Sequence, residues 1–176
     1  LGFAHENQWF PNAYDPKKVV SADCWAVGYN EDSMAPIPGK VTHLFHEGGC
    51  ATCPNNEWES DPKGGKGKAC KNTVILALLP IDDPANHDIW VVKTSPTAIR
   101  PFNKYASKIS QKNIPLGAVR TRLYLDPDSS YASIRFEALG IEADNIDTVM
   151  ARKDEATKRL MEEPDVSQFE MPKAGK

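Results

Sequence analysis

The chain has 176 residues, of which 40% are hydrophobic and 26% are charged, a composition typical of a soluble globular protein. Its 24 acidic residues outnumber its 21 basic residues, and the net charge of −3 excludes a uniformly basic surface and leaves only local basic patches. The longest apolar run, residues 74–79, is far shorter than the roughly 20 residues that cross a bilayer. We therefore expect a soluble, cytoplasmic protein with no membrane partner.

The first part of the chain predicts little regular structure. Residues 1–22 mix aromatic side chains with turn-forming residues, as in Trp9-Phe10-Pro11-Asn12, and they predict an irregular arm. A short strand is expected from Cys24 to Tyr29. Residues 40–46 alternate between two faces and predict a further strand.

The middle of the chain predicts two strands and a helix. Residues 73–79 form an apolar run that predicts a central strand buried on both faces, and residues 88–93 predict the next strand. Ser95 followed by Pro96 predicts a helix start, with the Ser95 side chain capping the first free amides. Apolar residues at helical spacing extend this helix to about residue 112: Ile99, Phe102, Tyr105, Ala106 and Ile109.

The last part predicts a hairpin and a helix. Two alternating runs, residues 119–125 and 131–138, are joined by a turn-forming segment and predict a β-hairpin. Asp144 is a candidate cap for a final helix that ends before Pro164. Residues 164–176 are expected to form a flexible tail.

The order of these elements favours one architecture. From residue 40 onward it reads strand, strand, strand, helix, strand, strand, which is the order of an OB-fold. We expect a mostly β (α+β), OB-fold-like five-stranded barrel over residues 1–163. Residues 46–71 would form a zinc-binding insertion, one helix would lie between strands three and four, and a further helix would lie at the C-terminal end. A generic α+β sheet has the same element order and remains an alternative.

The cysteine spacing predicts a metal site. Cys50 and Cys53 form a Cys-x-x-Cys pair and Cys70 closes the following loop, so that three thiolates can converge on one Zn²⁺ ion. Cys24 is the preferred fourth ligand, and His46 is the alternative. Disulfides, an iron–sulfur cluster or a redox pair are also open, although a proline directly after Cys53 argues against a thioredoxin-like helix there.

The same stretch carries a family resemblance. Residues 50–54, Cys-Ala-Thr-Cys-Pro, with Asn56, Trp58 and Ser60 and then residues 65–71, Gly-Lys-Gly-Lys-Ala-Cys-Lys, resemble a signature of zinc-containing phage proteins classed as single-stranded-DNA-binding. The chain departs from that pattern at Glu59, where the family has glycine. The resemblance covers 22 residues, with a weaker echo at residues 21–24. It implies a role in phage DNA replication or recombination, in the host cytoplasm.

Two basic regions are candidates for contact with nucleic acid. The hairpin predicts a face that combines cations with aromatic rings, and the glycine- and lysine-rich loop at residues 63–71 predicts an adaptable phosphate clamp, without the Walker A pattern of nucleotide hydrolases. The candidate residues are Lys66, Lys68, Lys71, Arg120, Arg122, Tyr124, Tyr131 and Arg135. An ordinary solvated surface is the alternative interpretation of both regions.

Three function classes follow from these patterns. The first is a single-stranded-DNA-binding protein, with other replication proteins as further partners. The second is a zinc-stabilised adaptor that binds another phage or replication protein. The third, a zinc enzyme that uses Glu57 or His46 at an open coordination position, lacks the signature of zinc deaminases, so we expect no enzyme.

Overall fold

The computed structural model describes residues 1–12, 15, 17–37 and 48–166. The strand predicted at residues 40–46, together with His46, lies outside these described residues. The chain divides into two compact units, one of residues 1–6 and 72–161 and the other of residues 7–71 and 162–176. Each unit has its own cluster of buried residues.

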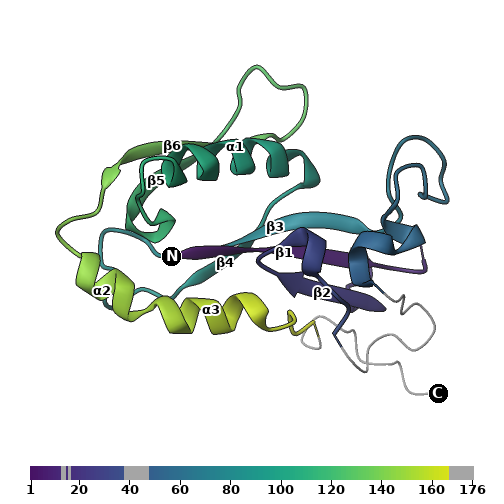
Figure 1. The fold of residues 1–176 in the computed structure, drawn as a ribbon, viewed down its shortest axis with the longest axis horizontal. Coiled ribbons are helices and arrows are strands. Elements are labelled where there is room, and N and C mark those ends of the chain that lie inside the picture. The colour runs from purple at the N-terminus through teal and green to yellow at the C-terminus, as the bar shows by residue number, and fades with distance from the viewer. Residues whose placement is uncertain (13–14, 16, 38–47, 167–176) are drawn as a thin grey trace. The chain divides into compact units, whose positions relative to one another are not determined.

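Four strands form one antiparallel sheet in the order β2-β1-β3-β4 (Figure 1). They are β1 (Gly2–Trp9), β2 (Cys24–Gly28), β3 (Lys71–Leu78) and β4 (Trp90–Lys93). The predicted central strand is confirmed, because residues 73–77 of β3 are all buried. β3 pairs with β4 from Ile75 opposite Lys93 to Leu78 opposite Trp90.

β1 overturns the prediction of an irregular arm over residues 1–22. Residues 4–7 are buried, although three of them, His5, Glu6 and Asn7, are polar. The Glu6 carboxylate lies 2.6 Å from the Lys93 ammonium and accepts a hydrogen bond of 3.2 Å from Thr73 Oγ1. Because these distant partners satisfy its charge, Glu6 is tolerated in a buried strand whose sequence has no apolar alternation.

In the first unit, α1 (Ile99–Ser110) packs against the hairpin of β5 (Val119–Leu125) and β6 (Ile134–Ile141). The predicted apolar stripe is confirmed, because Phe102, Tyr105 and Ile109 are buried. The Phe102 ring lies 5.4 Å from that of Phe136 on β6, in an edge-to-face arrangement that aromatic pairs favour. Aromatic burial therefore fixes the helix on the hairpin.

The start of this helix differs from the prediction. A 3-10 turn, Pro96–Ala98, precedes α1, and the Ser95 side chain makes no capping hydrogen bond. Its hydroxyl pairs instead with Thr97 Oγ1 at 2.7 Å. The Ala98 amide donates a hydrogen bond to the Ser95 backbone carbonyl, and this bond closes the turn without help from the Ser95 side chain.

The hairpin is confirmed, but its second strand begins later than predicted, at Ile134 instead of Tyr131. Alternation along residues 131–138 predicts that Ala132 and Ala138 face the core and that Ser133 points outward. In the structure Ser133 is 1% exposed, and both alanines are exposed. A register shift between Arg120 and Thr121 adds an extra residue to β6. This bulge interrupts the period-2 pattern at Leu139, whereas Ala132 and Ser133 precede the strand, where no strand alternation applies.

The C-terminal part contains two short helices where one was predicted: α2 (Ile146–Ala151) and α3 (Lys153–Met161). They are separated at Arg152, whose φ of −93° and ψ of 6° leave helical geometry. The Arg152 guanidinium donates to the backbone carbonyls of Pro84 and His87. These bonds anchor the break between the helices to the loop before β4.

The fold is α+β, as predicted. Within the described ranges the strands form the four-stranded sheet and the separate hairpin, and no closed barrel is detected. No helix in the described part of the chain is long and apolar enough to cross a membrane.

Candidate metal centre and candidate nucleic-acid interface

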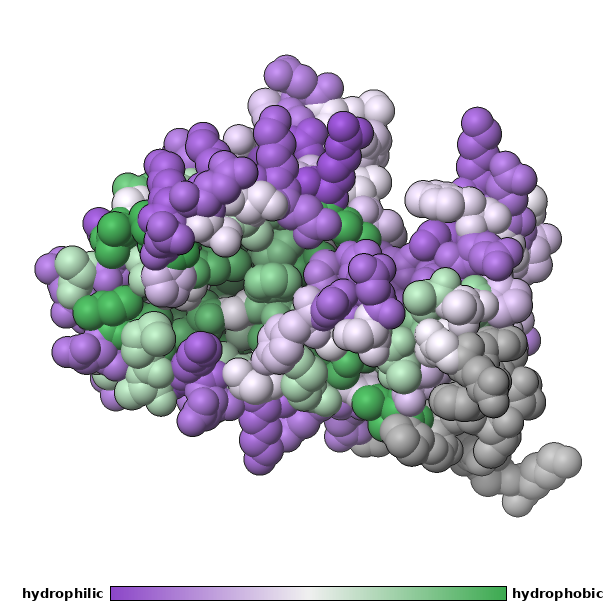
Figure 2. Space-filling model, in the orientation of Figure 1, coloured by the Kyte–Doolittle hydropathy of each residue, from purple (hydrophilic) through white to green (hydrophobic). Residues whose placement is uncertain are grey.

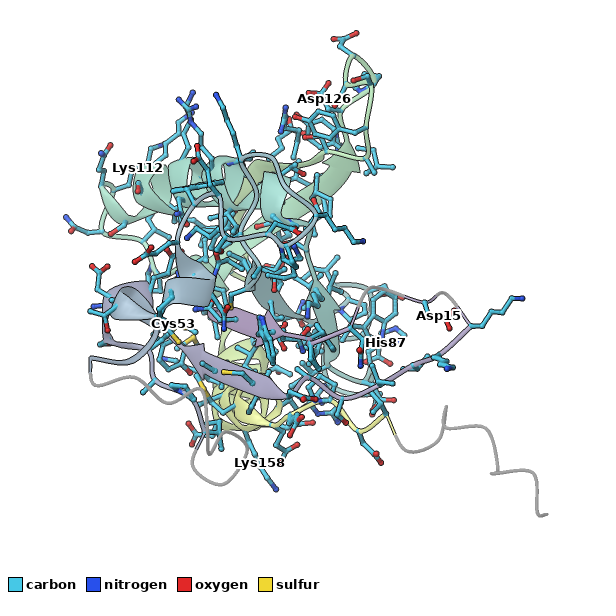
Figure 3. All side chains as sticks on the ribbon, turned by 90° about the vertical axis from the view of Figure 1, so that its right-hand side faces the viewer. Asp15, Cys53, His87, Lys112, Asp126 and Lys158 are labelled. Carbon is cyan, nitrogen blue, oxygen red and sulfur yellow. The ribbon has the colours of Figure 1, made fainter. Side chains whose placement is uncertain are left out.

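The four cysteines of the chain line one pocket in the second unit. Cys24 is the first residue of β2, Cys50 belongs to a 3-10 turn (Gly49–Thr52), Cys53 follows that turn, and Cys70 directly precedes β3. All four thiols are free (Figure 3, Cys53 labelled). The cavity between its lining residues is about 20 Å³, room for one occupant the size of a water molecule.

Local backbone geometry places Cys50 in this pocket. Gly49 has a φ of 69°, and a Cβ there would lie 2.4 Å from the backbone oxygen of Met34. That close approach lets the Cys50 amide donate a 2.8 Å hydrogen bond to the same oxygen. Only glycine combines this conformation with this contact.

The thiols influence one another's protonation. Burial, together with the smaller effect of the neighbouring thiolates, raises the pKa of Cys24 to about 11 and that of Cys70 to about 12. Burial also raises the pKa of Cys50, partly offset by a hydrogen bond with Asn7. The four groups are therefore close enough to repel one another when ionised. A bound cation has the opposite effect and lowers the pKa of the thiols that coordinate it.

The donor set fits Zn²⁺ by its chemistry, because four cysteines around one small cavity are typical of structural zinc sites. As the side chains stand, however, no three His, Cys, Asp or Glu residues within the described ranges are close enough together to hold a metal ion. The four predicted ligands therefore line one pocket, but their sulfur atoms are not at the distances at which they would coordinate one metal ion. Of the two predicted fourth ligands, Cys24 lies at the pocket, and His46 falls outside the described residues.

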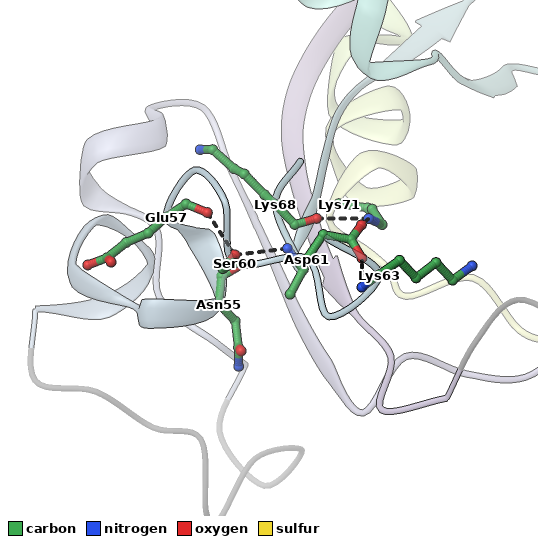
Figure 4. Close-up of polar contacts among 8 residues, drawn as sticks. Asn55, Glu57, Ser60, Asp61, Lys63, Lys68 and Lys71 are labelled. Atoms are coloured by element: carbon green, nitrogen blue, oxygen red, sulfur yellow. Dashed lines mark hydrogen bonds and ion pairs between the residues drawn. The ribbon is translucent and has the colours of Figure 1, made fainter. Parts of the chain in front are cut away.

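The loop between Cys53 and Cys70 is held by hydrogen bonds that converge on Ser60 (Figure 4). The Ser60 hydroxyl donates to the carbonyls of Asn55 and Glu57 at 3.0 and 2.7 Å and accepts from the Ala69 amide at 2.9 Å. The Cys70 amide donates to the Asn55 carbonyl at 2.7 Å. These bonds connect the two ends of the loop directly.

The predicted phosphate-binding lysines of this loop have different surroundings. The Lys71 ammonium lies 2.9 Å from the Asp61 carboxylate and also donates to the Lys68 carbonyl (Figure 4). Lys68 donates to Asn56 Oδ1 at 3.3 Å. Lys66 is exposed. The loop thus commits one of these three cations to an internal ion pair.

Each hairpin arginine predicted to contact phosphate also has an acidic partner. The distances are 3.4 Å for Arg120 with Glu142, 3.1 Å for Arg122 with Glu137 and 2.8 Å for Arg135 with Asp126. The outward direction of Arg120, Arg122 and Tyr124 is confirmed by their exposure. The three carboxylates, however, offset the positive charge on which the predicted phosphate contact depends.

The structure adds a basic groove that the sequence interpretation missed. Its cations repeat every four residues along α1 and the turn after it: Arg100, Lys104, Lys108 and Lys112. Tyr124, Arg135 and Glu137 line the same groove from the hairpin, and its volume is about 780 Å³. We call this surface the α1 groove. Residues four apart share one helix face, so the stripe was visible in the sequence once the helix was assigned.

The charge of the α1 groove is strongly unbalanced. All four α1-groove cations are exposed, and none of them has an ion-pair partner within the described parts of the chain. Arg135 also lines the groove, with its charge offset by Asp126 at 2.8 Å, and Glu137 is the single acidic lining residue. Tyr131 lies in the hairpin turn and is 57% exposed, but it does not line this groove.

A second hollow in the first unit is apolar. It measures about 330 Å³ and is lined mainly by hydrophobic side chains from β3, α1 and the hairpin, including Leu78, Leu123 and Phe136. Figure 2 shows hydrophobic surface in a hollow on the face toward the viewer. Arg120 and Glu142 are the charged groups in its lining.

Comparisons of the chain with protein-family models, with curated proteins and with solved structures found no match.

Proposed function

We propose that this chain binds single-stranded DNA, with the α1 groove as its main contact for phosphates. One observation carries the proposal: four exposed cations, without ion-pair partners in the described residues, repeat every four residues beside an exposed tyrosine. Four residues of helix advance about 6 Å, so the cations form a regular row that suits a polyanion with regularly spaced charges. Tyr124 supplies a ring on which an unpaired base can stack.

Single strands fit this groove better than duplex. A tyrosine that stacks on bases requires them to be unpaired, and α1 is fixed on the hairpin by its buried aromatic face. The net charge of −3 predicts modest affinity that depends strongly on salt. The resemblance of residues 50–71 to a phage family supports DNA as the ligand and DNA replication or recombination as the process.

Zn²⁺ is the proposed cofactor, with a structural role. Cys24, Cys50, Cys53 and Cys70 would hold it, and the ion would supply folding energy to the second unit. Four thiolates leave no coordination position for an activated water, so we propose no enzymatic activity. The OB-fold-like barrel is a proposal too, supported by the order of elements, in which α1 separates β4 from the hairpin.

The test is a binding titration of the zinc-loaded protein with a labelled thirty-nucleotide single strand at two salt concentrations. Lys104→Glu and Lys108→Glu should each weaken binding and lower the salt slope by about 0.7, the value for one lost phosphate contact. Lys153→Glu makes the same charge change on α3, outside the groove, and should leave the slope unchanged.

The adaptor function is the second candidate, and the apolar hollow beside β3 favours it. Exposed apolar surface of this kind is typical of protein interfaces. If the zinc-loaded protein shows no binding to single-stranded DNA at low salt, the adaptor takes first place.

A further inference from the structure

Trp58 is the most exposed of the large hydrophobic side chains in the described residues, at 74%. Single exposed apolar residues are common and carry no function by themselves. The surroundings of this indole are unusual, however, because a charged group and a strained backbone fix it in place. These features belong to the second unit and are independent of the α1 groove.

A cation lies over the Trp58 ring. The Lys68 ammonium is 5.2 Å from the ring centroid, within the range of cation–π attraction. Lys68 also donates to Asn56 Oδ1 at 3.3 Å, and Asn56 Nδ2 donates to the Cys50 carbonyl at 2.9 Å. A chain of three contacts therefore connects the exposed indole with the backbone of a candidate zinc ligand.

The backbone beside Trp58 is strained. Glu59 has a φ of 68°, in the left-handed region that costs a non-glycine residue about 1–2 kcal/mol. This is the position where the resembling family has glycine. Ser60, the next residue, holds the loop ends together through its three hydrogen bonds. The turn that presents Trp58 is thus held in one conformation despite its cost.

We propose that Trp58 is a stacking platform for an unpaired base, with Lys68 beside it to contact the adjoining phosphate. The inference rests on the proposed function and adds a second contact of a different physical kind. Glu57 and Glu59 flank Trp58, and their charges oppose phosphate. The platform therefore contributes through stacking more than through charge, and its loss leaves the salt dependence unchanged.

The experiment compares wild type, Trp58→Ala, Trp58→Tyr and Lys104→Glu in titrations with oligothymidylate of thirty nucleotides at two salt concentrations. Trp58→Ala should bind about 5- to 150-fold more weakly, the equivalent of one lost base stack, with an unchanged salt slope. Trp58→Tyr should restore most of the affinity. Zinc content and the circular dichroism spectrum of each variant serve as controls for folding.

The outcomes separate the two proposals. If Trp58→Ala binds as tightly as wild type while Lys104→Glu binds more weakly, the platform is wrong and the proposed function stands. If Trp58→Ala lowers the salt slope, Trp58 acts on Lys68 instead of on a base, which also overturns the platform. If wild type does not bind, the proposed function fails and the platform fails with it.

Discussion

The Lys93 ammonium lies 2.6 Å from a carboxylate oxygen of Glu6, whose side chain is 1% exposed. Thr73 donates a second hydrogen bond to this carboxylate. We expect Lys93→Met to destabilise the protein by about 1–3 kcal/mol, because it removes a charged partner from a buried group. Chemical denaturation measures the change. The double variant Glu6→Gln with Lys93→Met should recover part of the loss, and a double variant less stable than Lys93→Met would contradict this account.

Glu59→Gly should stabilise the second unit by about 0.5–1 kcal/mol, because glycine adopts a positive φ without the steric cost that Glu59 bears. Glu57→Gly is the matched control. It makes the same chemical change two residues away, where φ is −80°, and should lower stability. Thermal unfolding of the three proteins checks both signs, and equal effects of the two substitutions would refute the strain.

Removal of zinc should unfold the segment around the four cysteines, since the unfolded chain has no preformed site and binding energy is folding energy. We expect one Zn²⁺ per chain by elemental analysis and a lower melting temperature after chelation. Cys24→Ser should weaken zinc binding while His46→Ala leaves it intact. The reverse result would make His46 the fourth ligand, and freshly purified protein with disulfides and no metal would remove the site.

The Asp61–Lys71 ion pair should make the stability of the loop depend on pH. The hydrogen bond from Lys71, with a second from the Lys63 amide, holds the pKa of Asp61 below its ordinary value. The unfolded chain therefore binds this proton more tightly, so the stabilisation is fully present above the unfolded pKa of about 3.9 and is lost as the pH falls through the folded value. Unfolding of wild type and Asp61→Asn should differ at pH 6 and converge toward pH 3.

Tyr124→Ala should weaken binding of a single strand by about 1–3 kcal/mol with little change in salt slope, because Tyr124 lines the α1 groove and would stack a base. Tyr131→Ala should weaken binding less than Tyr124→Ala, because Tyr131 lies outside the groove. The sequence by itself predicts a contact for both residues. Parallel titrations decide between them, and a larger loss from Tyr131 would move the interface to the hairpin turn.

The sequence predicts correctly those elements whose buried residues recur at a regular short spacing along the chain. The apolar run of β3, the stripe of Phe102, Tyr105 and Ile109 on α1 and the alternation along β5 each appear within a few neighbouring residues. The Cys50–Cys53 spacing is likewise local, and it was enough to nominate a metal site. That Cys24 lines the same pocket as Cys70 required the folded chain.

The tertiary structure alone decided which polar groups are neutralised. Glu6 is tolerated in buried β1 because Lys93 and Thr73, which are distant in the sequence, contact its carboxylate. The residues around position 6 do not predict these two partners. The hairpin arginines point outward as the alternation predicts, yet carboxylates such as Glu142 and Asp126 take up their charge. Burial follows a short-range period in the sequence, whereas charge pairing depends on which distant side chains the fold brings within a few ångströms. The sequence by itself therefore determined the elements with periodic burial, such as β3 and α1, and the fold determined β1 and which cations remain available to a ligand.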